Sequence, residues 1–414
     1  MSYQEKYLKY KKKYLALKNQ LGGNWICPVC KEDNEDSRAT CIKMACSGQR
    51  PVAVAPDTAK RAKNVFYGPG LGWGDTINKF LRKREVKPFR VVNKDTKEAV
   101  DNHWSNIPSE ITGEFVLSTG STGAGLGQFY ALKGLSLTPD ESQLLVCDIY
   151  SRVVVVDARD GRSIRILKGQ TDSLERPSQA VVVPQTGQVL VLESQRSCIV
   201  VFAGIDDHTV VGNLGEGFGR GQHKLIRPAG LTVLDGDLGD VVTPDGPVVV
   251  VADTGNNRLA LWRVRDGTVV RHIGSKGINP GQFDNPTAVT VVPAQSTGTD
   301  EPWLVVVDEG NSRVQVLTRT GEVVRVLQGN ADIQLGSLLG GVTVCIWTGE
   351  VLVTDTENHR VVAWRLSDGE LRVVCGGVQG SEPGQLSYPT GVVASVNGSM
   401  WVADSGNNRL CLFR

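Results

Sequence analysis

The sequence predicts an all-β fold over most of its 414 residues, a six-bladed β-propeller preceded by a short helix and a small zinc-binding segment. Two observations predict the propeller. One pattern of four short strands recurs six times, and the last copy is completed by a strand that precedes the first copy. A third observation, four clustered cysteines near the N-terminus, predicts the zinc-binding segment.

The repeat is clearest where nearly the same residues occur twice, as VADTGNNRLALW at 251–262 and VADSGNNRLCLF at 402–413. Each unit has a Gly-rich stretch, an apolar strand, a second strand ending in an acidic residue, a tight turn, and two further strands. Four short strands joined by hairpin turns are typical of a propeller blade. The six acidic residues are Asp148, Glu193, Asp253, Asp308, Asp355 and Asp404.

The acidic residue and an Arg that follows it are predicted to brace the turn between them. We expect the carboxylate to accept hydrogen bonds from the turn amides and from the Arg, and Gly and Asn to supply positive φ. Recurrence of one polar pair at one place indicates scaffolding rather than catalysis. The clearest pairs are Asp253/Arg258, Asp308/Arg313, Asp355/Arg360 and Asp404/Arg409.

Closure of the ring is also predicted. The chain ends after the third strand of the sixth unit, and residues 113–129 match residues 267–283. We therefore expect Phe115–Ser118 to supply the missing fourth strand, which leaves no open sheet edge. The propeller is predicted to span residues 113–414.

This pattern resembles the NHL repeat family over residues 113–414, most specifically in units three, four and six. Unit two departs from the pattern because it lacks the turn Asn and spaces Glu193 and Arg196 differently. Unit five lacks the Gly-Gln-Phe segment. The resemblance implies a six-bladed propeller, and propellers with rigid walls and variable loops usually serve as docking surfaces for proteins.

The cysteine cluster within residues 23–52 predicts a zinc finger. Cys27 and Cys30 form a C-x2-C pair, and Cys41 and Cys46 form a C-x4-C pair. Four thiolates can complete a tetrahedral zinc shell. The metal would stabilise a segment too short to bury a core of its own.

Trp25, Asn34, Arg38 and the closing GQRP make this segment resemble the Ran-binding-protein-type zinc finger. That family has two residues between its last cysteines instead of four, and it binds ubiquitin or single-stranded RNA. Lys31 and Glu32 argue against the ubiquitin-binding use. We expect Trp25 to stack on a base and Arg38 to reach a base edge or phosphate; alternatively, Trp25 only covers the zinc and Asn34 only braces the knuckle.

The remaining N-terminal residues are basic. Residues 1–22 predict a Lys-rich helix with a tyrosine-bearing heptad seam, and they resemble a leader found in proteins of giant DNA viruses. Residues 53–112 predict a basic linker that is partly disordered. Residues 1–112 hold 21 Lys and Arg against 12 Asp and Glu, whereas residues 113–414 hold 24 against 32. This split indicates two parts with different partners.

The sequence favours a non-enzymatic binding protein. We expect the propeller to bind proteins, the finger and basic leader to bind single-stranded RNA, and no part to enter a membrane. No secretory signal is seen, so the predicted location is the cytoplasm, of a host cell or within a virion if the protein is viral. The five later cysteines are predicted to be core residues: Cys147, Cys198, Cys345, Cys375 and Cys411.

Two alternatives from other classes remain open. One is a hydrolase or lyase with its site in the propeller's central channel, which would require acidic or histidine side chains converging there. The five histidines, at 103, 208, 223, 272 and 359, occupy unlike places in the repeat and do not support it. The other is a ubiquitin-pathway adaptor, for which the sequence has no RING-like series of cysteine and histidine.

Overall fold

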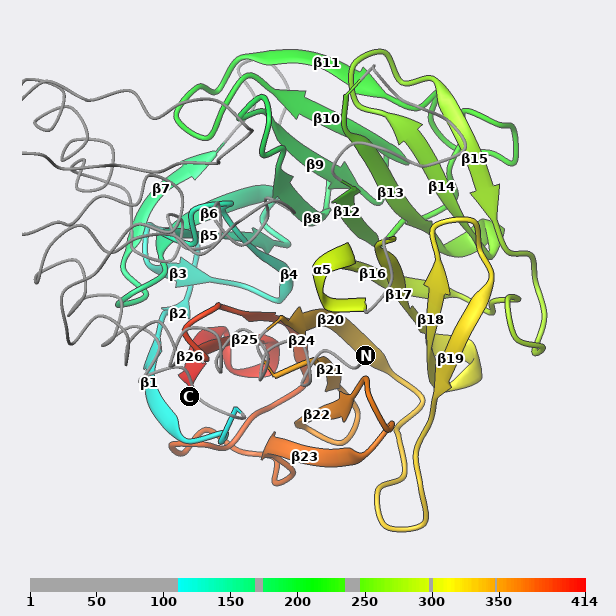
Figure 1. The fold of residues 1–414 in the computed structure, drawn as a ribbon. Coiled ribbons are helices and arrows are strands. Elements are labelled where there is room, and N and C mark those ends of the chain that lie inside the picture. The colour runs from blue at the N-terminus through cyan, green and yellow to red at the C-terminus, as the bar shows by residue number, and fades with distance from the viewer. Residues whose placement is uncertain (1–110, 168–173, 235–245, 298–300, 347) are drawn as a thin grey trace, which may run out of the picture. The chain divides into compact units, whose positions relative to one another are not determined.

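The computed structural model describes residues 111–167, 174–234, 246–297, 301–346 and 348–414. The predicted basic helix, the zinc finger and nearly all of the linker lie outside these residues. The described residues form six four-stranded antiparallel sheets arranged around one axis (Figure 1). The all-β, six-bladed propeller predicted from the repeat is therefore confirmed.

The blades follow one another along the chain, with the innermost strand named first. Blade 1 contains β4 (Leu132–Leu137), β5 (Gln143–Asp148), β6 (Arg152–Asp157) and β7 (Ser163–Leu167). Blade 2 contains β8 (Pro177–Val182), β9 (Val189–Glu193), β10 (Cys198–Phe202) and β11 (Val210–Leu214). Blade 3 contains β12 (Gly230–Leu234), β13 (Val248–Asp253), β14 (Arg258–Arg263) and β15 (Val269–Ile273).

The second half of the ring repeats this order. Blade 4 contains β16 (Pro286–Val292), β17 (Trp303–Asp308), β18 (Arg313–Thr318) and β19 (Val323–Leu327). Blade 5 contains β20 (Leu339–Cys345), β21 (Glu350–Asp355), β22 (Arg360–Arg365) and β23 (Leu371–Gly376). Blade 6 contains β24 (Pro389–Ala394), β25 (Met400–Asp404), β26 (Arg409–Phe413) and β1 (Phe115–Thr119).

The core lies between the blades rather than within them. The second strands are Val-rich, and β13, with the sequence VVVVAD, is buried along its whole length. Both faces of such a strand are apolar because each sheet is covered by a neighbouring blade on either side. Six hydrophobic clusters result, one at each interface between adjacent blades. The five propeller cysteines are free and buried, as predicted, and all except Cys198 belong to these clusters.

The fourth place in blade 6 is taken by β1, which pairs antiparallel with β26. The pairing joins residues near the two ends of the propeller, because Glu114 and Arg414 exchange backbone hydrogen bonds of 3.0 and 2.9 Å. Ile111 precedes the expected start of the domain at residue 113, yet it is fully buried in the cluster between blades 5 and 6. Its carbonyl accepts a hydrogen bond of 2.8 Å from Arg372, which fixes the segment that leads into β1.

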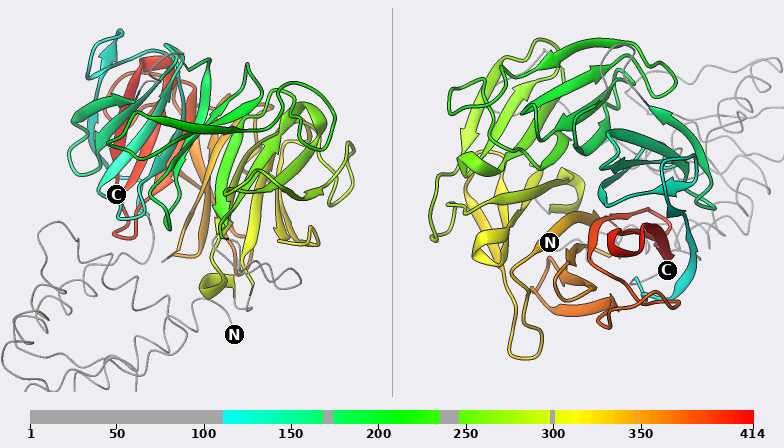
Figure 2. Two further views of the ribbon diagram at one scale, coloured as in Figure 1. Left: turned by 90° about the horizontal axis from the view of Figure 1, so that it is seen from above. Right: turned by 180° about the vertical axis from the view of Figure 1, so that it is seen from behind.

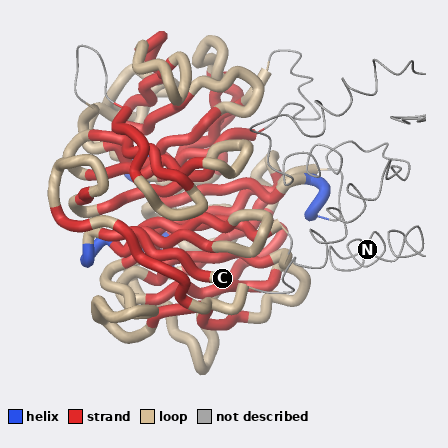
Figure 3. The backbone as a smooth tube through the Cα atoms, turned by 90° about the vertical axis from the view of Figure 1, so that its left-hand side faces the viewer, coloured by secondary structure: helices blue, strands red, loops and turns tan. Residues whose placement is uncertain are grey.

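Strands dominate the described backbone (Figure 3). Within the described residues, helix is limited to α5 (Ala294–Thr297) and three 3-10 turns, η1 (Thr254–Asn256), η2 (Glu309–Asn311) and η3 (Ser405–Asn407). The two-residue strands β2 (Ser121–Thr122) and β3 (Gln128–Phe129) pair in parallel within the loop that leads into blade 1. None of the helices found in the described residues has the length and apolar character to cross a bilayer.

Candidate functional site: the loop face of the propeller

The Gly-rich loops between blades and the turns joining second to third strands lie together at one edge of the blades, which we call the loop face. They share this edge because the first strand of a blade starts where the antiparallel second strand ends (Figure 2). The described residues of the loop face are the loops 120–131, 174–176, 215–229, 274–285, 328–338 and 376–388 and the turns 148–152, 193–198, 253–258, 308–313, 355–360 and 404–409.

Blade 4 shows how an acidic residue holds this face together. Asp308 is fully buried, and its Oδ2 accepts hydrogen bonds from Arg313 Nε at 2.7 Å and Asn311 Nδ2 at 2.9 Å. Its Oδ1 accepts a bond of 2.7 Å from the backbone N–H of Asp284, in the loop that leads into the blade. One carboxylate thus joins a turn, a strand and a preceding loop, and these charge-assisted bonds offset its burial.

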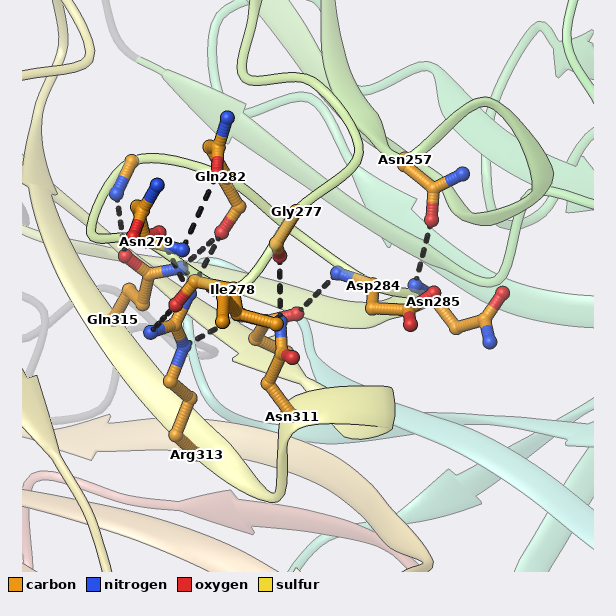
Figure 4. Close-up of polar contacts among 12 residues, drawn as sticks. Asn257, Gly277, Ile278, Asn279, Gln282, Asp284, Asn285, Asn311, Arg313 and Gln315 are labelled. Carbon is orange, nitrogen blue, oxygen red and sulfur yellow. Dashed lines mark hydrogen bonds and ion pairs between the residues drawn. The ribbon is translucent and has the colours of Figure 1, made fainter.

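Arg313 extends the same network into the Gly-rich loop. Its guanidinium donates to the carbonyl oxygens of Ile278, Asn279 and Gln282 at 2.7–2.9 Å (Figure 4). Only 6% of the side chain is exposed, so its N–H groups donate to backbone carbonyls rather than to water. The planar fork of Arg suits several carbonyls at once, and the arrangement fixes the loop's shape.

The structure brings together all four predicted turn pairs. Arg258 lies 2.8 Å from Asp253, Arg360 lies 2.8 Å from Asp355, and Arg409 lies 2.7 Å from Asp404. Each of these arginines also donates to loop carbonyls, including Lys224 O, Gln334 O and Gln385 O. The pairs therefore act in positioning loops, and they are not aimed at a cavity.

Blades 1 and 2 carry variants of this pair. Arg152 lies 2.8 Å from Asp148 at a shorter sequence spacing. In blade 2, Oε2 of the longer Glu193 lies 3.5 Å from Arg196, and the Cys198 thiol donates to the same oxygen at 3.9 Å. Burial raises the pKa of Glu193, although the Glu175 amide and Arg196 oppose the shift. Of the six acidic residues at the ends of second strands, Glu193 therefore lies farthest from its Arg partner.

Two details of the turn differ from the sequence expectation. The amide that the carboxylate binds comes from the preceding loop, as with Ile226 N to Asp253 at 2.8 Å; a turn amide, from Tyr150, is used only in blade 1. The left-handed residue is the one before the Arg, for example Asn257 at φ 56°, and the expectation of positive φ at the turn Gly is wrong. Gly255 is required by space, because a Cβ there would lie 2.2 Å from Ile226 Cγ2.

Two of the described histidines, His272 and His359, contribute to the same scaffold. His359 occupies the left-handed position of its turn, and its Nδ1 accepts a bond of 3.1 Å from Tyr388 N. His272 donates from Nε2 to Gln222 O and accepts from Arg258 at Nδ1, each at 3.2 Å. Burial, assisted by the Arg258 charge, lowers the pKa of His272, which favours the neutral ring. Across the ranges that the structure describes, no three His, Cys, Asp or Glu side chains form a metal-binding group.

The central channel is narrow, and Gln179 is the one polar side chain among the described residues that line its cavity. Its lining comes from the innermost strands of all six blades: Gly134, Leu135, Gln179, Gly230, Leu231, Ala288, Val289, Gly341, Val342, Gly391 and Val392. Glycine is needed here for close approach, because a Cβ on Gly230 would lie 2.7 Å from Ala288 Cα. The cavity measures about 30 Å³, near the volume of one water molecule. The acid and base groups that a channel-centred hydrolase requires are not part of this lining.

Large exposed apolar side chains are concentrated on the loop face. Of thirteen in the described residues, five lie on the outer strands β11, β19 and β23 and the other eight on the loop face. The eight are Leu126, Tyr130, Tyr150, Phe218, Ile278, Leu338, Val378 and Tyr388. This set was not predicted from the sequence. The sequence does contain one indication of it, because an apolar residue stands in the middle of four Gly-rich loops, at 126, 218, 278 and 378.

The predicted zinc ligands Cys27, Cys30, Cys41 and Cys46 lie outside the described residues. The predicted RNA-contacting residues Trp25, Asn34 and Arg38 lie outside them as well. Zinc and RNA binding therefore stay predictions, based on the donor chemistry of the sequence alone.

Comparison with known proteins supports the assignment of the repeat. The NHL repeat family matches residues 339–364 and 386–413, which lie in blades 5 and 6. A human protein, E3 ubiquitin-protein ligase TRIM32, is 29% identical over 164 residues, which are 37% of this chain and 23% of the ligase. This chain thus spans less than a quarter of the length of that relative.

Two solved structures are similar in fold at low identity. Hydrazine synthase of Kuenenia stuttgartiensis has a TM-score of 0.47 and 16% identity, covering 70% of this chain and 78% of that one. The WD40 β-propeller domain of Doa1 has a TM-score of 0.45 and 13% identity, covering 68% and 78%.

The fold and the loop face define the class of protein: a β-propeller built on rigid blades, whose exposed loops are held in place by buried ion pairs. More particularly, it is a six-bladed β-propeller in which blades 5 and 6 match the NHL repeat.

Proposed function

We propose that this chain is a non-enzymatic binding protein whose propeller docks other proteins through its loop face. The observation that carries the proposal is the placement of eight of the thirteen exposed large apolar side chains on that one face. Contiguous exposed apolar surface is costly in water and marks interaction sites. The buried arginine network fixes the loops that present these side chains, which lowers the entropy lost on binding.

The N-terminal part supplies a second binding module in this proposal. Cys27, Cys30, Cys41 and Cys46 would hold one zinc ion, because four thiolates are the donor set of a closed structural zinc site. Trp25, Asn34 and Arg38, together with the basic residues 1–22, would contact single-stranded RNA. Residues 1–112 carry the excess of positive charge that a polyphosphate partner requires. We place the protein in the cytoplasm, where its five buried propeller thiols stay reduced.

One specific observation favours a second function. TRIM32, by its name, is an E3 ubiquitin-protein ligase, and 23% of its length matches 37% of this chain. The propeller of this chain would then recruit a protein for ubiquitin transfer as an adaptor. Co-expression with a tagged ubiquitin would test this. Ubiquitin conjugates of the docked protein that are lost in the variants Tyr388→Gly and Arg176→Gly/Arg227→Gly would support the adaptor role.

Crosslinking in cells tests the first proposal, with separate recovery of bound RNA and bound proteins. We expect proteins to be recovered with both the wild type and a Cys27→Ser/Cys30→Ser variant, and RNA with the wild type alone. Recovery of neither would overturn the binding role. Proteins without RNA would leave the propeller as the functional part and reduce the finger to a structural accessory.

A further inference from the structure

The residues around the mouth of the central channel on the loop face differ in chemistry from blade to blade. We define the mouth ring as the residue directly before the first strand of each blade or, in blade 3, directly before Pro228, which leads into β12. Its members, from blade 1 to blade 6, are Ala131, Arg176, Arg227, Asn285, Leu338 and Tyr388. All except the half-buried Ala131 are exposed. The repeat pattern does not fix the residue types at these six positions, so their side chains are available to recognise a ligand.

Backbone geometry makes two of these identities unusual. Arg176 and Tyr388 have φ values of 52° and 45°, in the left-handed region. Gly or Asn adopts this region at lower cost, and blade 4 has Asn285 there at φ 52°. Arg227 at φ 46° repeats the pattern. Large side chains at strained, exposed positions do not improve packing, which points to selection for what they contact.

The apolar half of the mouth spans three consecutive blades. Leu338 in blade 5 and Tyr388 in blade 6 are followed by Tyr130 and Tyr150 in blade 1, each between 43% and 48% exposed. The rings of Tyr130 and Tyr150 lie 5.2 Å apart, and the ring of Tyr388 lies 4.5 Å from that of His359. These contacts hold the aromatic side chains in place, as in preformed binding surfaces.

The basic part of the mouth also spans consecutive blades. Lys133, the second residue of β4, is exposed in blade 1, and Arg176 and Arg227 follow in blades 2 and 3. No ring member is acidic. Three carboxylates beside ring members are already engaged: Glu175 is paired with Arg196 at 3.1 Å, Asp284 lies 3.9 Å from Lys276, and Glu357 accepts hydrogen bonds from Ser337. The mouth thus presents cations beside an apolar surface.

We infer that the mouth ring binds an acidic peptide segment that carries a large apolar side chain, with its carboxylates on Arg176 and Arg227 and its apolar side chain against Leu338 and Tyr388. This inference rests on the proposed docking function. Charge complementarity selects a peptide over a nucleic acid, because residues 113–414 carry an excess of acidic residues, 32 against 24 basic ones. A polyphosphate would be repelled by that excess, whereas one or two carboxylates need only the local cations.

Glycine substitutions provide a test that leaves the backbone intact. Arg176→Gly with Arg227→Gly, and separately Tyr388→Gly, remove the proposed contacts while relieving the left-handed strain. Asn285→Gly makes the same backbone change in blade 4 and is the matched control. The probe is a short fluorescein-labelled peptide in which Glu residues flank Leu and Phe, and its anisotropy is measured with the full-length protein. A peptide with Lys in place of Glu and a single-stranded oligouridine RNA complete the set.

We expect the acidic peptide to bind, the Lys peptide not to bind, and both mouth variants to weaken binding about tenfold or more, with Asn285→Gly unchanged. Equal binding of both peptides, no binding, or insensitivity to the mouth variants would overturn the inference. Oligouridine binding that the same variants abolish, with an inert peptide, would replace it with a nucleic-acid surface.

A photocrosslinker keeps this inference separate from the proposed function. It is placed at Tyr388 and, in a second protein, at Ile278, which is 75% exposed on the loop face but is not a member of the mouth ring. Proteins captured in cells from Ile278 but not from Tyr388 would refute the mouth ring and leave the rest of the loop face as the docking surface. Capture from neither position would contradict both the mouth-ring inference and the proposed docking function.

Discussion

Arg313 Nε lies 2.7 Å from Asp308 Oδ2 in a pair whose side chains are 6% and 0% exposed, and the guanidinium at the same time fixes three carbonyls of the neighbouring loop. The pair therefore joins the scaffold of one blade to the loop that the propeller presents. Because both charges are buried, removing one of them leaves the other without compensation.

Replacement of Asp308 by Ala should consequently destabilise the propeller strongly. The change leaves the Arg313 charge unpaired and the Asp284 amide without its acceptor, and we expect the free energy of unfolding to fall by about 3–5 kcal/mol. Urea denaturation followed by tryptophan fluorescence measures it. Glu370→Ala removes the acid from the exposed Arg365–Glu370 pair and should barely move the midpoint. Similar losses in the two variants would show that the network is not stabilising.

The sequence predicted this scaffold well because each unit repeats it. Six acidic residues at the ends of second strands could be aligned, and the partner of Asp308 followed from the spacing of Asp308 and Arg313 alone. The donor to Asp308 Oδ1 could not be found in this way, since the Asp284 amide belongs to a loop that only tertiary packing brings to the turn.

The candidate docking surface was less accessible from the sequence. The apolar residues in the Gly-rich loops were visible, but their exposure depends on how each loop folds over its arginine. The asymmetry of the mouth ring depends on the spatial order of the blades, since blade 6, which carries Tyr388, lies beside blade 1 only when the ring closes. Burial of Ile111 also required the closed ring, because its pocket lies between blades 5 and 6.

A second prediction concerns the turn glycine. In Gly255→Ala the new methyl group would collide with Ile226 Cγ2 at 2.2 Å, and we expect a loss of about 1–3 kcal/mol in the free energy of unfolding. Gly212 lies in the exposed strand β11, with no atom within 4 Å of an added Cβ and no left-handed φ. Gly212→Ala should therefore be tolerated in the same assay. Equal tolerance at both positions would contradict a packing requirement at Gly255.

A third prediction is the pH dependence of blade 2. Burial raises the pKa of Glu193, so the folded state holds its proton over a pH range in which the unfolded chain has lost it. Stability contributed by Glu193 is therefore present below the ordinary pKa of 4.5 and lost as pH rises through the raised value. Relative to Glu193→Gln, the wild type should become less stable between pH 4 and neutrality. Parallel stability curves in urea titrations would refute the shift, because all other groups are shared.

The zinc finger gives a fourth prediction. Metal analysis of the purified full-length protein should find one zinc per chain, and Cys27→Ser/Cys30→Ser should abolish it, because two of four thiolate ligands are lost. Cys198→Ala is the control. Burial raises the pKa of the Cys198 thiol to about 11, so this cysteine is a poor metal ligand at neutral pH. Zinc loss in the control, or zinc retained in the double variant, would place the metal elsewhere.

The last prediction concerns the pairing of β1 with β26. The rings of Phe115 and Phe413 lie 5.8 Å apart at an interplanar angle of 77°, and the strands that carry them pair through four registered residue pairs. A chain shortened to begin at residue 111 keeps this pairing, whereas one that begins at residue 120 exposes the edge of β26. We expect the first to stay monomeric and cooperatively folded, and the second to lose stability and associate through the open edge. Light scattering and thermal unfolding of the two proteins measure this directly, and indistinguishable behaviour would mean that β1 contributes little to holding the ring closed.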